Sequence, residues 1–247
     1  MNRYLTFLPA LALLAGQAGA APLLPQFDPA NFPQTASIDN PYLPFVPGFR
    51  AEVVGVSRDD AGERVEERTL TTHAGPGPVI AGVTTVMMED VGFVGTLMIE
   101  QTNDYYAQDM DGNVWYLGED VVNIHYDDED KEQSRDAKGT WRAGVNAALP
   151  GYAMPEQPAP GFAYQQEHAP ADQAMDWAEI MAVGGTLDIA GLTYCQVVSI
   201  FESSTAEPSL REVKHYAPGV GLIREDESVD AARANPQAHF DLVPAGK

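Results

Sequence analysis

Cysteine is almost absent from this sequence. Cys195 is the single one in 247 residues, which excludes an intramolecular disulfide and a cysteine-rich zinc site. It lies in a run of β-forming residues, 193–201, with no histidine or cationic residue close to it in the chain. A nucleophilic cysteine needs such a neighbour to form its thiolate, whereas a buried free cysteine behaves as a small apolar residue. We therefore expect Cys195 to lie in the core.

Positive charge is also scarce. Lys and Arg number 14 against 36 Asp and Glu, which gives a formal net charge of −22. A surface this negative repels phosphate backbones and anionic headgroups but tolerates cations. The charge balance therefore argues against a nucleic acid partner. The 45% hydrophobic and 20% charged residues are an ordinary globular mixture, not that of a disordered polyelectrolyte.

Long apolar runs are absent after residue 20. Residues 1–20 contain Arg3, then an apolar run, then the small residues Ala18-Gly19-Ala20, which are the three parts of a secretory signal peptide. The run is about half of the roughly 20 residues that a membrane-spanning helix needs. We expect a signal peptide over 1–20 and a periplasmic or extracellular protein. We expect no membrane anchor after cleavage, since no cysteine follows directly to be lipidated.

Familiar catalytic motifs are missing as well. The sequence has no Gly-x-Ser-x-Gly elbow, no His-Glu-x-x-His and no glycine-rich phosphate loop ahead of a helix. Its five histidines do not fall at metal-ligand spacing. Glycosidases need only two carboxylates at the right separation, and 36 acidic residues neither prove nor exclude that arrangement.

What the sequence does contain is β-forming runs that alternate with turn signals. Residues 21–49 carry seven prolines, so we expect an extended arm there, anchored by Tyr42, Leu43 and Phe45. Residues 50–247 read as one antiparallel β domain, in which a strand from Glu63 onward ends at Pro76-Gly77-Pro78 and shows its charges to water. The prediction is an all-β fold with a single curled sheet, half-barrel or barrel-like, whose concave face is the default ligand site.

Five different motifs follow one another over residues 38–226. They are DNPYLP at 39–44, DYYAQDMDGNVWYLG at 104–118, GTWRAG at 139–144, Pro150-Gly151 with Met154-Pro155, and YAPGVGL at 216–222. Together they resemble a family of uncharacterised bacterial secreted proteins and lipoproteins, and the last is similar to a motif of curled-sheet lipoprotein-carrier folds. The resemblance implies an envelope or extracellular location and a β-rich half-barrel, and it implies no activity. Many family members carry a lipid anchor, whose cysteine this chain lacks.

Asp109, Asp111 and Asn113 are the best metal-ligand candidates. Their alternating oxygens suit a hard cation such as Ca²⁺, and they resemble the opening of a helix–loop–helix calcium loop. The match then fails, because Val114 replaces the usual glycine and the flanking residues are β-forming. A plain hairpin turn is the favoured interpretation, with Ca²⁺ or a lanthanide ion as the alternative.

Aromatic residues crowd the middle of the chain and are the candidates for a ligand-binding face. The alternative for them is core and cross-strand packing. The candidates are Tyr105, Tyr106, Trp115, Tyr116, Trp141 and Trp177.

Three classes of function remain open. The leading hypothesis is a non-enzymatic secreted or periplasmic binding protein, whose ligand and oligomeric state the sequence does not specify. The alternative is an extracytoplasmic hydrolase that uses paired carboxylates or a metal, and the third is a structural protein with an open sheet edge or apolar patch. An enzyme should gather titratable groups with shifted pKa values in one cleft, whereas a binding module should show an apolar pocket.

Overall fold

The computed structural model describes residues 21–58 and 62–244, so the predicted signal peptide over 1–20 lies outside the described residues. The regular secondary structure of the described residues is strand, apart from one short 3₁₀ turn, η1 (Pro29–Asn31). The strands are β1 (Arg50–Arg58), β2 (Arg64–Ile80), β3 (Val83–Val94), β4 (Leu97–Gln108), β5 (Val114–Tyr126), β6 (Glu132–Asp136), β7 (Trp141–Arg142), β8 (Leu149–Met154), β9 (Ala163–Gln165), β10 (Glu167–His168), β11 (Asp176–Ile189), β12 (Leu192–Ser204), β13 (Arg211–Ala217), β14 (Gly221–Glu227) and β15 (Ala238–Leu242). Within the described ranges, no helix has the length and apolar character needed to cross a membrane.

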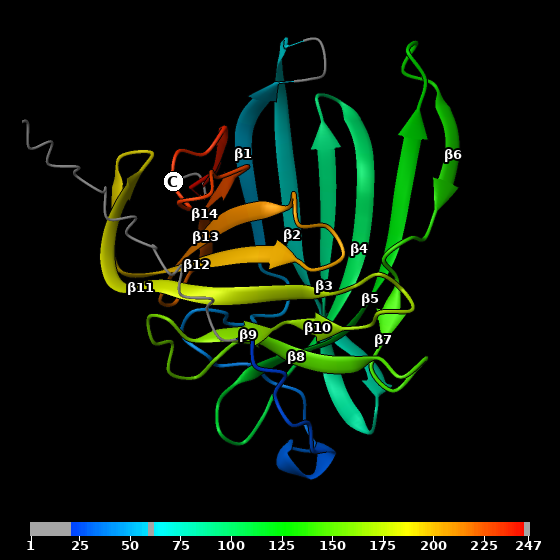
Figure 1. Ribbon diagram of the computed structural model, residues 1–247, viewed down its shortest axis with the longest axis vertical. Coiled ribbons are helices and arrows are strands. Elements are labelled where there is room, and N and C mark those ends of the chain that lie inside the picture. Colours follow the sequence, from blue (N-terminus) through cyan, green and yellow to red (C-terminus); the bar gives the residue numbers. More distant parts are fainter. Residues whose placement is uncertain (1–20, 59–61, 245–247) are drawn as a thin grey trace, which may run out of the picture.

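These strands form one antiparallel sheet that curls into a nearly closed barrel (Figure 1). Their order is β10-β8-β5-β4-β3-β2-β1-β15-β14-β13-β12-β11-β9, with β6 and β7 paired to β5 outside that path. Most neighbours in the order are joined by short hairpins, as expected where turn residues separate β-forming runs. The predicted all-β, barrel-like fold is confirmed.

A short segment of the chain joins the two ends of this strand order. β9 pairs with β11 at one end and β10 pairs with β8 at the other, and only Gln166 separates β9 from β10. The backbone of Gln166 also donates a hydrogen bond to the Asp176 carbonyl at 2.9 Å. β8 passes so close to this segment that any side chain at Gly151 would collide with the Gln165 carbonyl. We name residues 163–168 the closing segment, because they fasten the barrel.

The inner face of the barrel changes from apolar to acidic along several strands. On β12 the inner series is Val198, Ile200 and then Glu202, since alternate residues of a strand share a face. β3 has the same order, from Val86 to Asp90. β11 runs the other way, so its acidic residue, Asp176, comes before the apolar Ile180. An apolar cluster fills one end of the interior, formed by Ile38, Val86, Val114, Met154, Tyr164, Ala178, Ile180, Val198 and Ile200. The other end is left to polar side chains.

The proline-rich arm covers the apolar end of the interior. Tyr42, Leu43 and Phe45 pack against the apolar cluster, as predicted. Asn40, 2% exposed, fixes the arm: its backbone N–H donates to Gln108 Oε1 at 2.9 Å, and its side chain bonds the Gly112 and Pro155 carbonyls and the arm's own backbone. Asparagine suits this position because it offers a donor and an acceptor together.

The prediction that β2 ends at Pro76-Gly77-Pro78 is wrong. The strand continues through both prolines to Ile80. β1 pairs with β2 only as far as Thr72, and the backbone of Gly48 and Phe49 bonds that of His73. Beyond His73, β2 pairs with β3 alone. A missing proline N–H costs no ladder bond on a free edge, and register shifts beside Gly75 and Val79 absorb the remaining distortion.

The expected burial of Cys195 is also wrong, because its side chain is exposed. Gln196 adopts a φ of +57° and adds one residue to β12 between the pairs Thr186–Cys195 and Gly185–Val197. Such a bulge breaks the alternation of inward and outward side chains. The run of β-formers therefore does not place the thiol inside.

We expect Asn40→Ala to detach the arm. The change leaves buried carbonyls without a donor, so the free energy of unfolding should fall by about 1–3 kcal/mol. Limited proteolysis should then cut within residues 21–49 of the folded protein. Ser37→Ala, at an exposed arm position, is the control and should leave both readouts unchanged. Equal proteolysis of the two variants would contradict this anchoring role.

Candidate functional site

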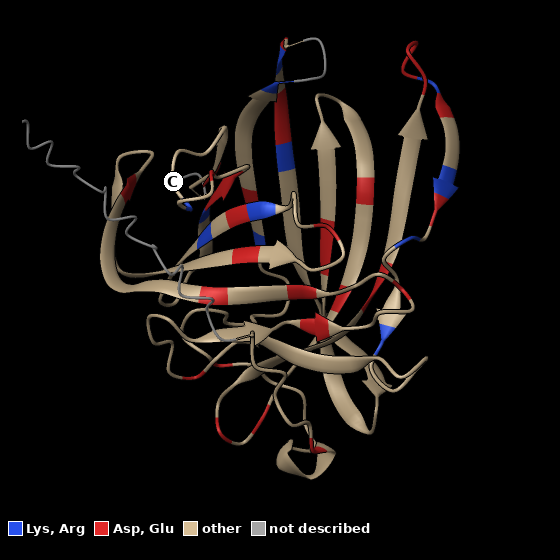
Figure 2. Ribbon diagram, in the orientation of Figure 1, with Lys and Arg blue, Asp and Glu red and all other residues tan. Residues whose placement is uncertain are grey.

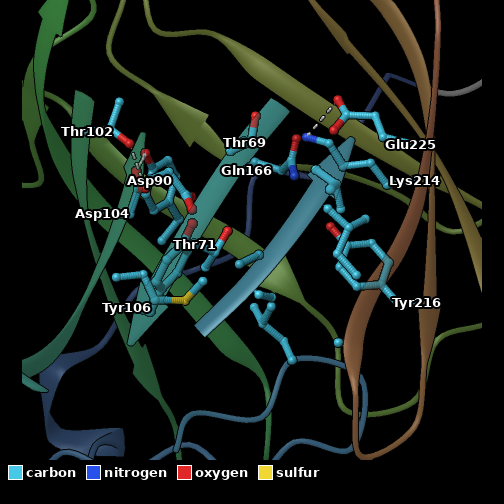
Figure 3. A pocket seen from close by; sticks show the side chains of 18 of the residues that line it. Thr69, Thr71, Asp90, Thr102, Asp104, Tyr106, Gln166, Lys214, Tyr216 and Glu225 are labelled. Atoms are coloured by element: carbon cyan, nitrogen blue, oxygen red, sulfur yellow. Dashed lines mark hydrogen bonds and ion pairs between the residues drawn. The ribbon is translucent and has the colours of Figure 1, made fainter. Parts of the chain in front are cut away.

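The polar half of the barrel interior encloses a cavity of about 450 Å³. Side chains from opposite walls of the barrel face one another across this cavity (Figure 3). Nine carboxylates line it together with Lys214: Asp90, Glu100, Asp104, Glu119, Glu167, Asp176, Glu202, Glu212 and Glu225. In Figure 2, positions of Asp and Glu are marked on β10, β11 and β12 in front and on β4 behind, so acidic residues lie on strands at both sides of the barrel.

Strands β3, β4 and β5 supply one wall. Asp104 is 6% exposed; its carboxylate accepts hydrogen bonds from the Tyr116 hydroxyl at 2.6 Å and the Thr102 hydroxyl at 3.0 Å. Asp90 lies beside Asp104 on the neighbouring strand, and Glu119 follows along β5. Among the described residues that line the cavity, this wall holds no lysine or arginine.

Strands β12, β13 and β14 supply the opposite wall, centred on Lys214. The Lys214 ammonium lies 2.8 Å from a Glu202 oxygen, 2.9 Å from Glu212 and 4.0 Å from Glu225. Gln166 of the closing segment donates a further hydrogen bond to Glu202 at 3.1 Å. The Lys214 ammonium, on a side chain that is 23% exposed, thus lies among three carboxylates.

The closing segment also places Glu167 in the cavity wall. Glu167 is 4% exposed, and its Oε1 accepts a hydrogen bond from the Asp176 backbone N–H at 3.4 Å. Its Oε2 lacks a donor of good geometry among the described residues, although the Trp141 indole N–H, also unpaired, interacts with this carboxyl. Asp90 Oδ1 on the β3 wall is shielded from solvent and unpartnered in the same way. A buried carboxylate oxygen without a donor is costly, since desolvation is not repaid by a hydrogen bond.

The cavity leads outward between β5 and the loops that follow β10 and β12. A second hollow of about 550 Å³ lies there, and both hollows are lined by Glu100, Thr102, Glu119, Glu167 and Asp176. The outer rim includes His125, Asp136, Lys138, Asp172 and Glu207. We name this second hollow the mouth.

Burial sets the pKa values of the cavity carboxyls. Desolvation, followed by the charge of Asp90, raises the pKa of Asp104 to about 7, and desolvation with the charge of Asp104 raises that of Glu119 to about 8. Burial and the charges of Asp176 and Glu119 raise the pKa of Glu167 well above its ordinary value. These carboxyls hold protons at or near neutral pH, because the charged form is poorly solvated.

On its own wall, Lys214 opposes the rise in carboxyl pKa that burial causes. Burial opposes its charge, but Glu202, Glu212 and Glu225 outweigh burial and raise the pKa of Lys214. Against burial, the ammonium and hydrogen bonds hold the pKa of Glu212 below its usual range, while burial and the Glu212 charge raise that of Glu225. An ammonium inside this barrel therefore stabilises an ionised carboxylate beside it.

The predicted aromatic ligand face is only partly assembled at this cavity. Tyr106 and Tyr116 line it, with ring centroids 5.0 Å apart. Trp115 and Trp141 are core residues, and the Tyr105 hydroxyl donates instead to Asp120. Trp177 packs on Phe201 in a separate cluster. Ligand contact by any of the six stays a prediction.

The predicted metal residues lie in the β4–β5 turn, away from the cavity. Asp109 is 5% exposed, and its carboxylate accepts hydrogen bonds from the backbone of Asp111 and Asn113, the Asn113 amide and the Trp115 indole, at 2.8–3.4 Å. Asp111 Oδ2 accepts from Asn31 at 2.9 Å. These contacts match the hairpin-turn interpretation, and Ca²⁺ binding by the loop stays a prediction.

Sequence reasoning missed the cavity carboxylates. Their signal is a period-two polar series, visible as Glu100-x-Thr102-x-Asp104-x-Tyr106 on β4 and Glu212-x-Lys214-x-Tyr216 on β13. Such alternation shows that one face is polar, but it does not show that this face points inward. By the criterion set from the sequence, this gathering of shifted carboxyls in one cavity is the arrangement expected of an enzyme and not the apolar pocket expected of a binding module.

Comparisons with known proteins leave the family open. No family model matches the chain, and no curated protein matches it. Among solved structures, the chain is similar to the crystal structure of a "putative lipoprotein" from Parabacteroides distasonis ATCC 8503, at 13% identity and a TM-score of 0.37. That match covers 85% of this chain and 98% of the other. The family resemblance drawn from the sequence motifs stays a prediction.

Stability should fall as pH rises between about 5 and 8. Asp104 and Glu119 bind protons more tightly in the folded than in the unfolded chain, so their contribution is present at the acidic end and lost as pH passes 7 to 8. We expect thermal melts to show about 3 kcal/mol less stability at the alkaline end, or a Tm lower by about 10 °C. Glu119→Gln should flatten the dependence, and Glu129→Gln in an exposed loop should not. A Tm that rises with pH across this window would contradict the assignment.

Asp109→Ala should lower the Tm equally in EDTA and in Ca²⁺. The carboxylate's hydrogen-bond donors belong to the turn and to Trp115, so their loss should cost about 2–3 kcal/mol whether or not metal is present. Asp111→Ala, at an exposed position with one side-chain donor, is the control and should cost far less. A native Tm that rises in Ca²⁺ and an Asp109→Ala Tm that does not would establish the loop as a metal site.

Proposed function

We propose that this is an extracytoplasmic, non-enzymatic binding protein that encloses a small polar ligand in its barrel. One observation carries the proposal: the wall of a 450 Å³ cavity holds buried carboxylate oxygens, on Asp90 and Glu167, that lack a donor of good geometry among the described residues. Buried polar groups in proteins are nearly always paired. A ligand that enters the cavity would supply the missing donors.

The size and shape of the cavity support this proposal. Small-molecule sites occupy about 300–1,000 Å³ and combine a pre-formed hollow with a few placed polar groups. Here the arm and the apolar cluster seal one end, and the mouth gives access from the side. The export predicted from residues 1–20 would place this binding outside the cytoplasm.

A hydrolase acting by general acid–base catalysis is the second candidate. The observation in its favour is that Asp104 and Glu119, in one cavity, have pKa values of about 7 and about 8. Acid–base catalysis works best when two groups have pKa values pushed apart, one to donate and one to accept the proton. Both of these carboxyls are shifted upward by burial, and Glu212, the described cavity carboxyl whose pKa is lowered, is held in an ion pair with Lys214 at 2.9 Å instead of being free to accept a proton. The arrangement therefore supports binding better.

A thermal-shift screen of the full protein tests the proposal. The compounds should represent separate chemical classes: alkyl amines, amino acids, neutral sugars and carboxylic acids. We expect at least one class to raise the Tm by several degrees, since a ligand at 100 times its Kd adds about 2.7 kcal/mol. Incubation followed by mass spectrometry should recover the compound unchanged, whereas a changed mass would favour the hydrolase.

Adjacent threonines on β2 provide a matched pair of variants. Thr71 lines the cavity, and Thr72 is its neighbour on the opposite face of the strand. Thr71→Phe should fill the cavity and abolish the thermal shift, while Thr72→Phe should retain it. The proposal would be overturned if no class raises the Tm and native mass spectrometry finds no small molecule on the purified protein.

A further inference from the structure

Lys214 shows how this barrel accommodates a positive nitrogen. Its ammonium lies on the β13 wall and is held by the carboxylates of Glu202 and Glu212 at 2.8 and 2.9 Å, with Glu225 at 4.0 Å. An ammonium offers three donors and a full charge, which is what three converging carboxylates require. Lys214 thus satisfies one side of the cavity from within the chain.

The other side of the cavity has the carboxylates without the ammonium. Asp90, Asp104 and Glu119 face the interior from β3, β4 and β5, and no described lysine or arginine lines the cavity on that wall. Tyrosine and threonine hydroxyls satisfy Asp104, but Asp90 Oδ1 is left without a partner. The place that Lys214 fills on one wall is unfilled on the other.

A second unpartnered oxygen lies on a different element. Glu167 Oε2, on the closing segment, is buried where the cavity meets the mouth. Asp90 and Glu167 therefore mark two separate positions, one on the β3 wall and one at the passage outward. Each is an acceptor that one ammonium group of a bound molecule would satisfy.

We infer that the ligand is an aliphatic diamine or polyamine, with one ammonium held at Asp90 and Asp104 and a second held at Glu167. This inference rests on the proposed function, of which it names the ligand class. The Thr69 and Thr71 side chains line the cavity between the two walls, where the alkyl chain of such a molecule would lie. The acidic rim of the mouth, with Asp172 and Glu207, attracts the same class of molecule.

The spread of the carboxylates favours an elongated polycation over a metal ion. A Ca²⁺ ion needs six to eight oxygens at 2.3–2.6 Å around one point. Within the described ranges, no three His, Cys, Asp or Glu side chains converge as metal ligands. The carboxylates are instead distributed over facing walls and along the passage to the mouth, which suits charges that are separated along a chain.

Diamine binding should release protons. Burial raises the pKa of Asp90, Asp104 and Glu167, so the carboxyls that receive an ammonium bind protons more tightly in the empty cavity than they would in water. A neighbouring positive charge favours their ionised form, as Lys214 does for Glu212. Since alkyl amines stay charged well above neutral pH, affinity should increase as pH rises from 6 to 8.

Calorimetric titration of the full protein with cadaverine tests the inference, with pentylamine as the monoamine of equal chain length. We expect cadaverine to bind at least about tenfold more tightly than pentylamine, with proton release detected as a heat that depends on the buffer. Asp90→Asn and Glu167→Gln, which keep the shape of the protonated carboxyls, should each weaken cadaverine binding about tenfold or more. Glu89→Gln, next to Asp90 on β3 and outside the cavity lining, should change it less than about twofold.

Each other outcome overturns the inference in a recognisable way. Cadaverine affinity that neither Asp90→Asn nor Glu167→Gln reduces would place the diamine on the outer surface. Binding of Ca²⁺ or Mg²⁺ that depends on Asp90 would identify a metal site instead. A neutral or anionic ligand that binds in the thermal-shift screen, without cadaverine, would overturn the diamine and keep the proposed function. Failure of every class would overturn both.

Discussion

The ion pairs of Lys214 with Glu202 and Glu212 are the interaction on which the interior depends. Removing an ion from water costs several kcal/mol, and a buried charge is tolerated only when its partners are close and well placed. Here one ammonium offsets part of the negative charge of an acidic wall that faces another acidic wall across the barrel. Without Lys214, the carboxylates of both walls would have to remain protonated or repel one another. The stability of the barrel therefore depends on how far Lys214 reduces the repulsion among these carboxylates.

The strand pattern made the fold predictable but hid the site. Turn residues between β-forming runs located most hairpins, and the Asp109–Asn113 turn joins β4 to β5 as expected. Strand alternation assigns residues to two faces without saying which face is inside. The sequence predicts a wetted, charged face for the strand from Glu63 onward, because water stabilises isolated charged side chains, and it predicts no facing for the charges on the other strands. Glu100, Asp104 and Glu212 point inward because the barrel keeps a polar cavity there.

Other features of the structure are carried by no local sequence pattern. The prolines of β2 are tolerated because β1 begins at Arg50, opposite Thr72, and does not reach them. Only the strand pairing reveals this. Cys195 is exposed because a bulge at Gln196 interrupts the alternation of β12. Of the six aromatic candidates, only Tyr106 and Tyr116 reach the cavity; Trp115 and Trp141 stabilise the sheet elsewhere. Side chains of one type serve both roles, so composition cannot separate them.

The closing segment divides the molecule into a part that must stay constant and a part that is free to change. Gly151 faces the Gln165 carbonyl so closely that no other residue fits, which gives a physical reason for the Pro150-Gly151 motif. The cavity walls are held by hydrogen bonds and ion pairs between side chains and not by a backbone contact of this kind. Proteins descended from a common ancestor of this chain could therefore exchange wall residues, and with them the ligand, while the glycine and the closing segment persist. In such a lineage, a shared Gly151 and closing segment would indicate common ancestry. Differences among the cavity-lining residues would indicate that the members bind different ligands.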